Sequence, residues 1–311
     1  MRNTVNSIRR YRSLYQEAVA RWLVCLAVLV PPLDAVAWVI EDRMKVPVKV
    51  TTVQGKEVER EIYVALFYEN SSPEPRPLLV LNHGRSNHAA ERARLDVKRY
   101  ADAARWLTGF GFLVAVPVRV GYGLTGGEDV ENSGGCKRKN YPPVYRASAV
   151  QTLAVLDALR KRPGTAQDRA VVMGQSFGGT TAITVAAMNP PGIQGAINFA
   201  GGGGAFPEKE PQNPCGQPAL KRLFGRYGET ARIPTLWIYS ENDQLFGPKL
   251  PREWFEAFKA AGGVGEFELF PPLGSNGHLL FSRGPQLWHP RVQEFLLGIG
   301  YAPIAATPKR K

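Results

Sequence analysis

The chain has 311 residues, of which 44% are hydrophobic and 21% are charged. This length supplies enough apolar material for the buried core of one large domain, so we expect a globular protein. The formal net charge of +12 at pH 7 favours contact with anionic partners. The basic residues form only short clusters, without a long block interleaved with aromatic residues, and this pattern argues against nucleic-acid binding.

Residues 1–37 have the three-part layout of a secretory signal. A stretch with five arginines precedes the apolar run WLVCLAVLVPPL, which is followed by small residues, Ala35 and Ala37, of the kind expected before a cleavage site. Pro31 and Pro32 interrupt the run, which is shorter than the ~20 residues that a spanning helix needs. We therefore predict an exported protein, periplasmic or extracellular, with no stable membrane insertion after signal removal. A retained membrane anchor is the alternative, and the export route stays open.

Strand-like and helical patterns alternate along the rest of the chain. Residues 46–53 and 58–68 are typical of an antiparallel pair of strands at a sheet edge. Later apolar runs predict buried strands over 76–82, 111–118, 169–173, 193–200, 233–240 and 265–271. Helical patterns lie at about 95–107, 150–159, 180–188, 252–261 and 289–300. The alternation predicts a single α/β domain over 38–311, with a mostly parallel central sheet covered by helices on both faces.

A serine set among glycines follows one of the predicted buried strands. Gly174, Ser176 and Gly178 fit the pattern G-x-S-x-G, with a strand before them and a helix after them, as a nucleophile elbow requires. Such a turn presents the serine hydroxyl at the carboxyl edge of the sheet, where open α/β folds bind ligands. Ser176 is therefore the predicted nucleophile. The alternative is a plain glycine-rich bend that joins a strand to a helix.

A serine nucleophile needs a histidine base and an acid that orients it, in the order serine, acid, histidine for this architecture. Two histidines follow Ser176 in the chain. His278 lies in a loop after the last strand, whereas His289 lies at the start of the last helix and is typical of a capping or surface residue. Asp243 follows the predicted strand 233–240, which precedes the last strand, and is the predicted acid, with Glu241 as the alternative.

An oxyanion hole needs two backbone N–H donors near the nucleophile. The first is expected from Phe177, the residue after the serine, and the second from the turn LNHGRS that follows an earlier central strand. Gly84 permits a sharp turn there and leaves the Arg85 N–H as the predicted second donor, with Ser86 as the alternative. His83 is interpreted as a structural histidine that supports the turn.

Two irregular stretches, 121–146 and 201–218, follow strands of the same sheet and are expected at the rim of the site. Each carries one cysteine, Cys136 and Cys215, and the third cysteine lies in the predicted signal. In an oxidising compartment such an even pair can bond, so we predict a disulfide, with two free thiols as the alternative. Four aromatic residues of these stretches either line a substrate pocket or pack in the core: Tyr122, Tyr141, Tyr145 and Phe206.

An ordered set of segments resembles the α/β-hydrolase superfamily over roughly residues 45–300. The segments are LNHGRS, GYGLTGG, GQSFGG, YSENDQLFGP and GSNGHLLF. Within the superfamily the chain is similar to the dienelactone hydrolase-like serine esterases. The enzymes that name that family use a cysteine nucleophile, whereas position 176 here is a serine, which favours general carboxylic esters over dienelactones. The resemblance implies an α/β-hydrolase fold and no metal or organic cofactor.

These observations predict a serine hydrolase that cleaves a small-molecule or polymer-borne carboxylic ester through an acyl-enzyme intermediate. Two other functions stay open. One is an oligopeptidase-like serine peptidase, because the G-x-S-x-G-G string also resembles that group. The other is an exported binding protein that keeps the scaffold without activity.

Overall fold

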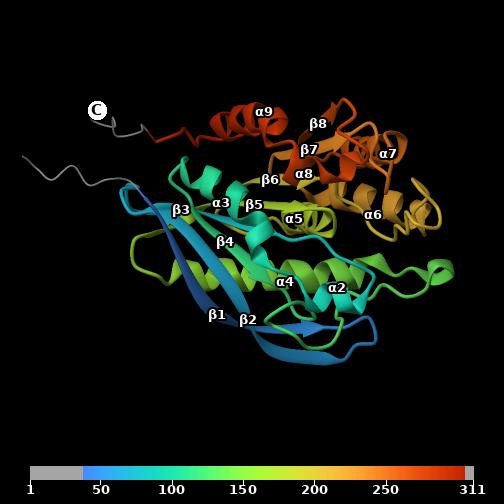
Figure 1. The fold of residues 1–311 in the computed structure, drawn as a ribbon, viewed down its shortest axis with the longest axis horizontal. Coiled ribbons are helices and arrows are strands. Elements are labelled where there is room, and N and C mark those ends of the chain that lie inside the picture. The colour runs from blue at the N-terminus through green and yellow to red at the C-terminus, as the bar shows by residue number, and fades with distance from the viewer. Residues whose placement is uncertain (1–37, 305–311) are drawn as a thin grey trace, which may run out of the picture. The chain divides into compact units, whose positions relative to one another are not determined.

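The structure is a computed structural model that describes residues 38–304, and the predicted signal over 1–37 lies outside the described residues. An eight-stranded sheet forms the centre of this part of the chain, with the strand order β1-β2-β4-β3-β5-β6-β7-β8 (Figure 1). The strands are β1 (Val39–Thr51), β2 (Glu57–Glu69), β3 (Arg76–Asn82), β4 (Leu113–Val118), β5 (Thr165–Gln175), β6 (Ile193–Phe199), β7 (Thr235–Ser240) and β8 (Gly265–Phe270).

The direction of pairing follows the predicted layout. β1 pairs antiparallel with β2, and β2 pairs antiparallel with β4, whereas the pairs from β4 to β8 are parallel. Residues of β3 and β4 are buried almost throughout, as expected for central parallel strands that helices cover on both faces. β1 instead alternates, with Val46, Val48 and Val50 buried and their neighbours exposed. The predicted fold class is confirmed.

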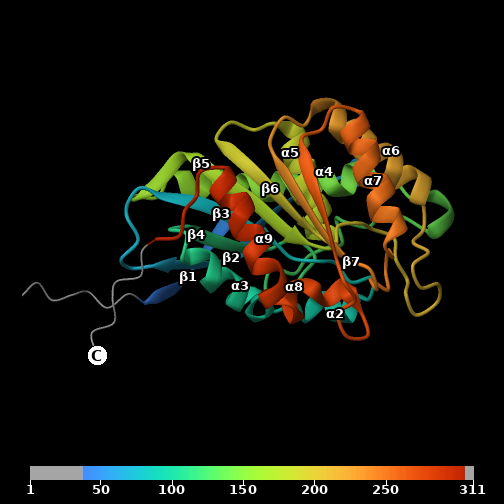
Figure 2. The same cartoon turned by 90° about the horizontal axis from the view of Figure 1, so that it is seen from above.

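Helices cover both faces of the sheet (Figure 2). They are α2 (Ala89–Ala93), α3 (Ala101–Thr108), α4 (Tyr141–Arg160), α5 (Phe177–Met188), α6 (Gln217–Thr230), α7 (Lys249–Ala260), α8 (Leu280–Arg283) and α9 (Pro285–Gly298). The alternation along β7 shows the two layers, because Leu236 and Ile238 pack with residues of α3 and α9 while Trp237 and Tyr239 pack with residues of α6 and α7. α4 and α5 also share a core cluster.

Two helical regions differ from the sequence prediction. The helix expected at about 95–107 begins instead with the 3-10 turn Val97–Tyr100, which continues into α3, and the separate short helix α2 precedes it. Asp96 causes the break, because its side chain accepts a hydrogen bond from the Lys98 N–H and thereby starts a new turn. The sequence analysis also missed α6 altogether. In the part of the chain that the structure describes, no helix is long and apolar enough to cross a membrane.

Candidate active site

The predicted nucleophile lies in a tight turn between β5 and α5. Ser176 has φ 58° and ψ −123°, a backbone conformation that only glycine adopts without strain, and its N–H donates to the Phe199 carbonyl at 2.8 Å. A Cβ on Gly174 would clash with the Gly178 carbonyl, and a Cβ on Gly178 would clash with the carbonyl of Asn82. The glycines are therefore required by the close approach of α5 to the ends of β5 and β3.

The predicted base and acid are in direct contact. His278 Nδ1 lies 2.9 Å from Asp243 Oδ2, and the Asp243 side chain is fully buried. Asp243 Oδ1 accepts hydrogen bonds from the N–H groups of Leu245, at 2.7 Å, and Phe246, at 3.1 Å. The carboxylate is thus held in place, and Nδ1 of the imidazole donates to it, which leaves Nε2 as the acceptor. Glu241 is exposed.

The turn that carries His278 lies beside the nucleophile turn. Gln175, the residue before Ser176, donates a hydrogen bond from Nε2 to the His278 carbonyl at 3.4 Å. The Phe246 ring packs edge-on against the imidazole, with 5.4 Å between ring centroids, and lines the same cavity as Ser176. Within residues 38–304 no hydrogen bond joins the Ser176 hydroxyl to His278, and bonds between a nucleophile and its base are often long in ligand-free enzymes. His289 lies elsewhere, stacked on Trp106 at 4.0 Å.

The predicted oxyanion donors come from two turns that touch. A Cβ on Gly84 would lie 3.2 Å from the Ser176 Cβ, so the turn after β3 runs directly against the nucleophile. Neither the Arg85 N–H nor the Phe177 N–H donates a hydrogen bond to another described residue. Both donors are therefore available to a developing negative charge. The N–H of the alternative residue, Ser86, likewise donates to no other described residue, and its hydroxyl donates to Glu91 at 2.5 Å.

A cavity of about 300 Å³ opens over Ser176. Its wall includes Phe177, Tyr141, Tyr145, Phe206, Phe246 and the glycines that follow β6. Two tyrosine hydroxyls are tied to the backbone, since Tyr141 donates to the Cys215 carbonyl at 2.5 Å and Tyr145 donates to the Gly202 carbonyl at 2.9 Å. Tyr122, which the sequence placed with them, does not line the cavity but is buried behind it.

The rim of the cavity carries the disulfide that the sequence suggested. Cys136 and Cys215 are bonded, with their Cα atoms 5.0 Å apart. The Cys215 N–H donates to the carbonyl of Gly204, at 2.9 Å, and Gly204 itself lines the cavity. The bond therefore joins the two irregular stretches at the entrance to the candidate site.

Cations outnumber anions along the cavity wall. Arg85 forms a bidentate pair with Asp129, at 2.6 and 2.7 Å, and Arg92 approaches the same carboxylate at 3.1 Å. Burial disfavours the charged form of Asp129, but the hydrogen bonds from Arg85 outweigh this effect and lower its pKa. Lys139 also lines the cavity and donates to the Gly134 carbonyl at 2.7 Å. Burial and the nearby Arg85 charge lower the Lys139 pKa.

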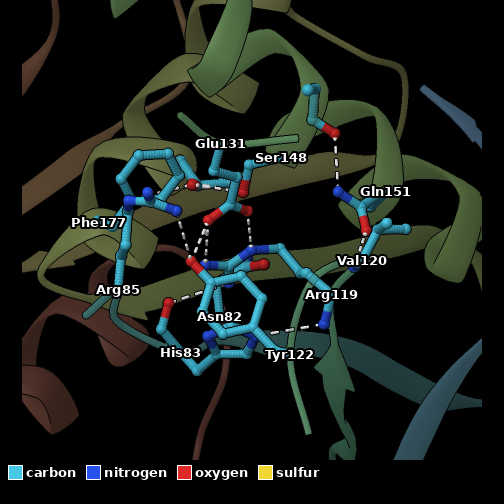
Figure 3. Close-up of polar contacts among 12 residues, drawn as sticks. Asn82, His83, Arg85, Arg119, Val120, Tyr122, Glu131, Ser148, Gln151 and Phe177 are labelled. Carbon is cyan, nitrogen blue, oxygen red and sulfur yellow. Dashed lines mark hydrogen bonds and ion pairs between the residues drawn. The ribbon is translucent and has the colours of Figure 1, made fainter. Parts of the chain in front are cut away.

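The sequence analysis missed a buried ion pair between Arg119 and Glu131 (Figure 3). It lies behind the turn after β3 that carries Arg85, called the oxyanion turn below. Both residues belong to the irregular stretch after β4, where no spacing pattern marks them. The sequence offers no signal that singles them out, because Glu128 and Asp129 are acidic residues of the same glycine-rich segment. In the described residues, no three His, Cys, Asp or Glu side chains gather into a group that could hold a metal ion.

Comparisons with known proteins bear on the family and the fold. A family model described as serine aminopeptidase, S33, matches residues 73–227, about half of the chain. A search of curated proteins finds no match. Among solved structures, a putative dienelactone hydrolase from Klebsiella pneumoniae subsp. pneumoniae has a TM-score of 0.58 at 15% identity, over 84% of this chain and 98% of that chain.

Two esterases share the fold at the same level of identity. An esterase from Pyrococcus furiosus has a TM-score of 0.54 at 15% identity, over 82% of this chain and 91% of its own. An acetyl xylan esterase from Paenibacillus sp. R4 has a TM-score of 0.52 at 15% identity, over 84% of this chain and 88% of its own. These likenesses cover 82–84% of this chain, and the residues matched by the family model include Ser176. The chain therefore belongs to the α/β-hydrolase superfamily.

Proposed function

We propose that the protein is a serine esterase that cleaves carboxylic esters through an acyl-enzyme intermediate. One observation carries the proposal: the buried pair of His278 and Asp243 lies beside the strained turn of Ser176, under a cavity with two unused N–H donors. This arrangement has the parts that acyl transfer requires.

In this mechanism His278 Nε2 takes the Ser176 proton while the serine oxygen attacks the ester carbonyl carbon. The carbonyl oxygen becomes an oxyanion and accepts hydrogen bonds from the N–H groups of Phe177 and Arg85. The tetrahedral intermediate then expels the alcohol, which takes the proton from His278. Water, deprotonated by the same imidazole, releases the acid from the serine. Asp243 stabilises the imidazolium throughout and stays ionised.

A peptidase is the second candidate, because the matching family model is described as a serine aminopeptidase. An aminopeptidase must hold the positively charged amino terminus of its substrate. The cavity over Ser176 has Arg85, Arg92 and Lys139 against Asp129, a charge balance that disfavours a cationic group. This balance favours the ester.

The experiment compares ester and amide hydrolysis in the wild type and two variants. We expect turnover of p-nitrophenyl esters of graded acyl length, little turnover of aminoacyl p-nitroanilides, and labelling by a fluorophosphonate probe. Ser176→Ala should remove both ester turnover and labelling. Asp243→Asn should keep the fold and lower kcat by about 10⁴-fold, because the histidine loses the partner that fixes its tautomer. Faster cleavage of the anilides than of the esters would favour the peptidase.

We also propose that the protein is exported. The disulfide supports this, since such bonds persist mainly in oxidising compartments. Fractionation of expressing cells, with N-terminal sequencing, should place a mature chain beginning at Trp38 outside the cytoplasm. A full-length chain in the cytoplasmic fraction would contradict export.

A further inference from the structure

The turn that carries the Arg85 N–H is held by a residue from a different part of the chain. Arg119 follows β4, and its backbone N–H donates to His83 Nε2 at 3.2 Å. Its guanidinium Nη1 donates to the His83 carbonyl at 2.9 Å. His83 Nδ1 in turn donates to the Gly84 carbonyl at 2.7 Å. His83 is therefore fixed through its ring and its backbone, two residues before the predicted oxyanion donor.

The charge of Arg119 is balanced by a carboxylate that is equally buried. Arg119 Nε lies 2.5 Å from Glu131 Oε1, and neither side chain is exposed to solvent. Tyr122, also buried, donates its hydroxyl to Glu131 Oε2 at 2.6 Å. Burying two charges costs several kcal/mol per ion, and an apolar pair of similar size is often as stable. Stability alone is therefore a weak reason for this pair.

The same hydrogen-bond network also contacts the side chain of Arg85, the residue whose N–H is the predicted second oxyanion donor. Tyr122 accepts a hydrogen bond from Arg85 Nη1 at 3.3 Å, and Asp129 holds the same guanidinium with two hydrogen bonds. Figure 3 shows the Arg85 side chain reaching toward Tyr122 and Glu131, with Arg119 and His83 beyond them. The Arg119 guanidinium also lies 5.6 Å from the Phe177 ring centre. The network thus contacts both residues that carry the predicted donors.

We infer that Tyr122, Glu131 and Arg119 are positioning residues that hold the Arg85 and Phe177 N–H groups at the oxyanion. The inference rests on the proposed function. Oxyanion donors act only within about 2.7–3.1 Å of the developing charge, and removing one donor costs about 10²–10³-fold in kcat. A variant that keeps both N–H donors but loses a side-chain contact that holds the turn should show a smaller loss of kcat, about 10-fold, because the donor shifts rather than disappears.

The test uses Tyr122→Phe, which removes only the hydroxyl that joins Glu131 to Arg85. The ring that packs on His83, at 4.5 Å between centroids, is kept. The matched control is Tyr227→Phe on α6, which removes a hydroxyl that accepts a bond from Thr184. Hydrolysis by the wild type and its loss in Ser176→Ala are established first. A null result in the Tyr122 variant then contradicts the positioning role and not the esterase.

We expect Tyr122→Phe to lower kcat about 10-fold while KM stays within about twofold, because the donors act on the transition state and not on the bound ester. The inhibition constant of an alkyl boronic acid, which forms a tetrahedral anionic adduct on serine, should rise by the same factor. Rates are normalised to active sites titrated with the fluorophosphonate, so partial unfolding does not count as lost kcat. Tyr227→Phe should change neither quantity.

Asp129→Asn provides a second, independent cut in the network and keeps the inference testable if Tyr122→Phe does not fold. Asp129 is partly exposed, and its amide isostere retains the shape while it loses the charge that anchors Arg85. The control is Asp157→Asn, which alters an exposed pair with Arg160 on α4. Parallel losses in kcat and boronic acid affinity support the inference. Unchanged kcat, or a loss confined to KM or to the folded fraction, would overturn it.

Discussion

At the scale of single residues, the two buried histidines near the site have opposite electrostatic surroundings. His278 meets the Asp243 carboxylate, which would stabilise the imidazolium of the proposed mechanism. His83 accepts a hydrogen bond from the Arg119 guanidinium at its backbone carbonyl and has no exposed surface. Burial first, and then the charges of Arg119 and Arg99, lower the pKa of His83 well below 6.5. His83 is therefore a neutral structural histidine, as the sequence analysis interpreted it.

The lowered pKa of His83 predicts an acid-dependent loss of stability. The unfolded chain binds a proton at this histidine below about pH 6.5, whereas the folded protein does not, so protonation favours the unfolded state as the pH falls. The contribution of His83 to the free energy of unfolding should therefore be complete above about pH 6.5. Below that pH, the free energy of unfolding should fall by about 1.4 kcal/mol per pH unit because of this group. Urea unfolding of the wild type and of His83→Asn, between about pH 7.5 and about pH 5.5, measures the difference.

The variant is the control for all other titrating groups, because only the histidine is replaced. Its free energy of unfolding should start lower at neutral pH and fall less steeply in acid than that of the wild type. Parallel curves for the two proteins would show that His83 takes up a proton in the folded state, against this prediction.

At the scale of elements, the turn that carries Ser176 brings the start of α5 into direct backbone contact with the ends of β5 and β3. Gly178, in the first turn of α5, lies against the carbonyl groups at the end of β3, and a Cβ added at Gly178 would lie 2.6 Å from the His83 carbonyl oxygen. The residues that precede the Arg85 donor and those that follow Ser176 are thus packed directly on each other. A change in this contact must move either the nucleophile or the oxyanion turn.

We expect Gly178→Ala to lower the free energy of unfolding by about 3 kcal/mol, since the added methyl group meets rigid backbone. Ester turnover should fall as well, because relief of the clash displaces the turn. Gly298→Ala in α9 is the matched control, as a Cβ there meets no atom within 4 Å. That change should be neutral or stabilising by up to about 1 kcal/mol. Equal stability of the two variants would contradict the packing argument.

Elements with a strong local pattern could be predicted from the sequence, whereas those that depend on tertiary contacts could not. The buried strands were found because continuous apolar runs are typical of parallel sheets. α6 was missed although Leu220, Leu223, Phe224 and Tyr227 follow helical spacing, because Pro218 and the nearby glycines favour an irregular segment. The same reason applies to the site. Motifs located Ser176, but no local pattern marks an ion pair whose partners meet only in the folded chain.

At the scale of the whole molecule, the disulfide joins the two irregular stretches that border the cavity. Tyr141 donates to the Cys215 carbonyl, and the Lys139 side chain lies beside Gly216, so both sides of the bond contact the cavity wall. Little regular structure supports these stretches: the 3-10 turn Cys136–Arg138 is the short element between β4 and α4 in the described chain. The bond therefore restricts a region that backbone hydrogen bonds constrain weakly.

Removing the disulfide should affect stability and substrate binding more than chemistry. The bond closes a loop with a sequence separation of 79, which in the chain-entropy model stabilises the folded state by about 4 kcal/mol. The double variant Cys136→Ser, Cys215→Ser avoids a free thiol and should show a lower thermal midpoint.

The KM of this double variant for esters should rise several-fold, because the cavity wall is less ordered, while kcat per titrated active site stays within about twofold. A reductant should shift the wild type toward these values and leave the double variant unchanged. A loss of kcat equal to the rise in KM would instead show that the disulfide also positions the turns that carry Ser176 and Arg85.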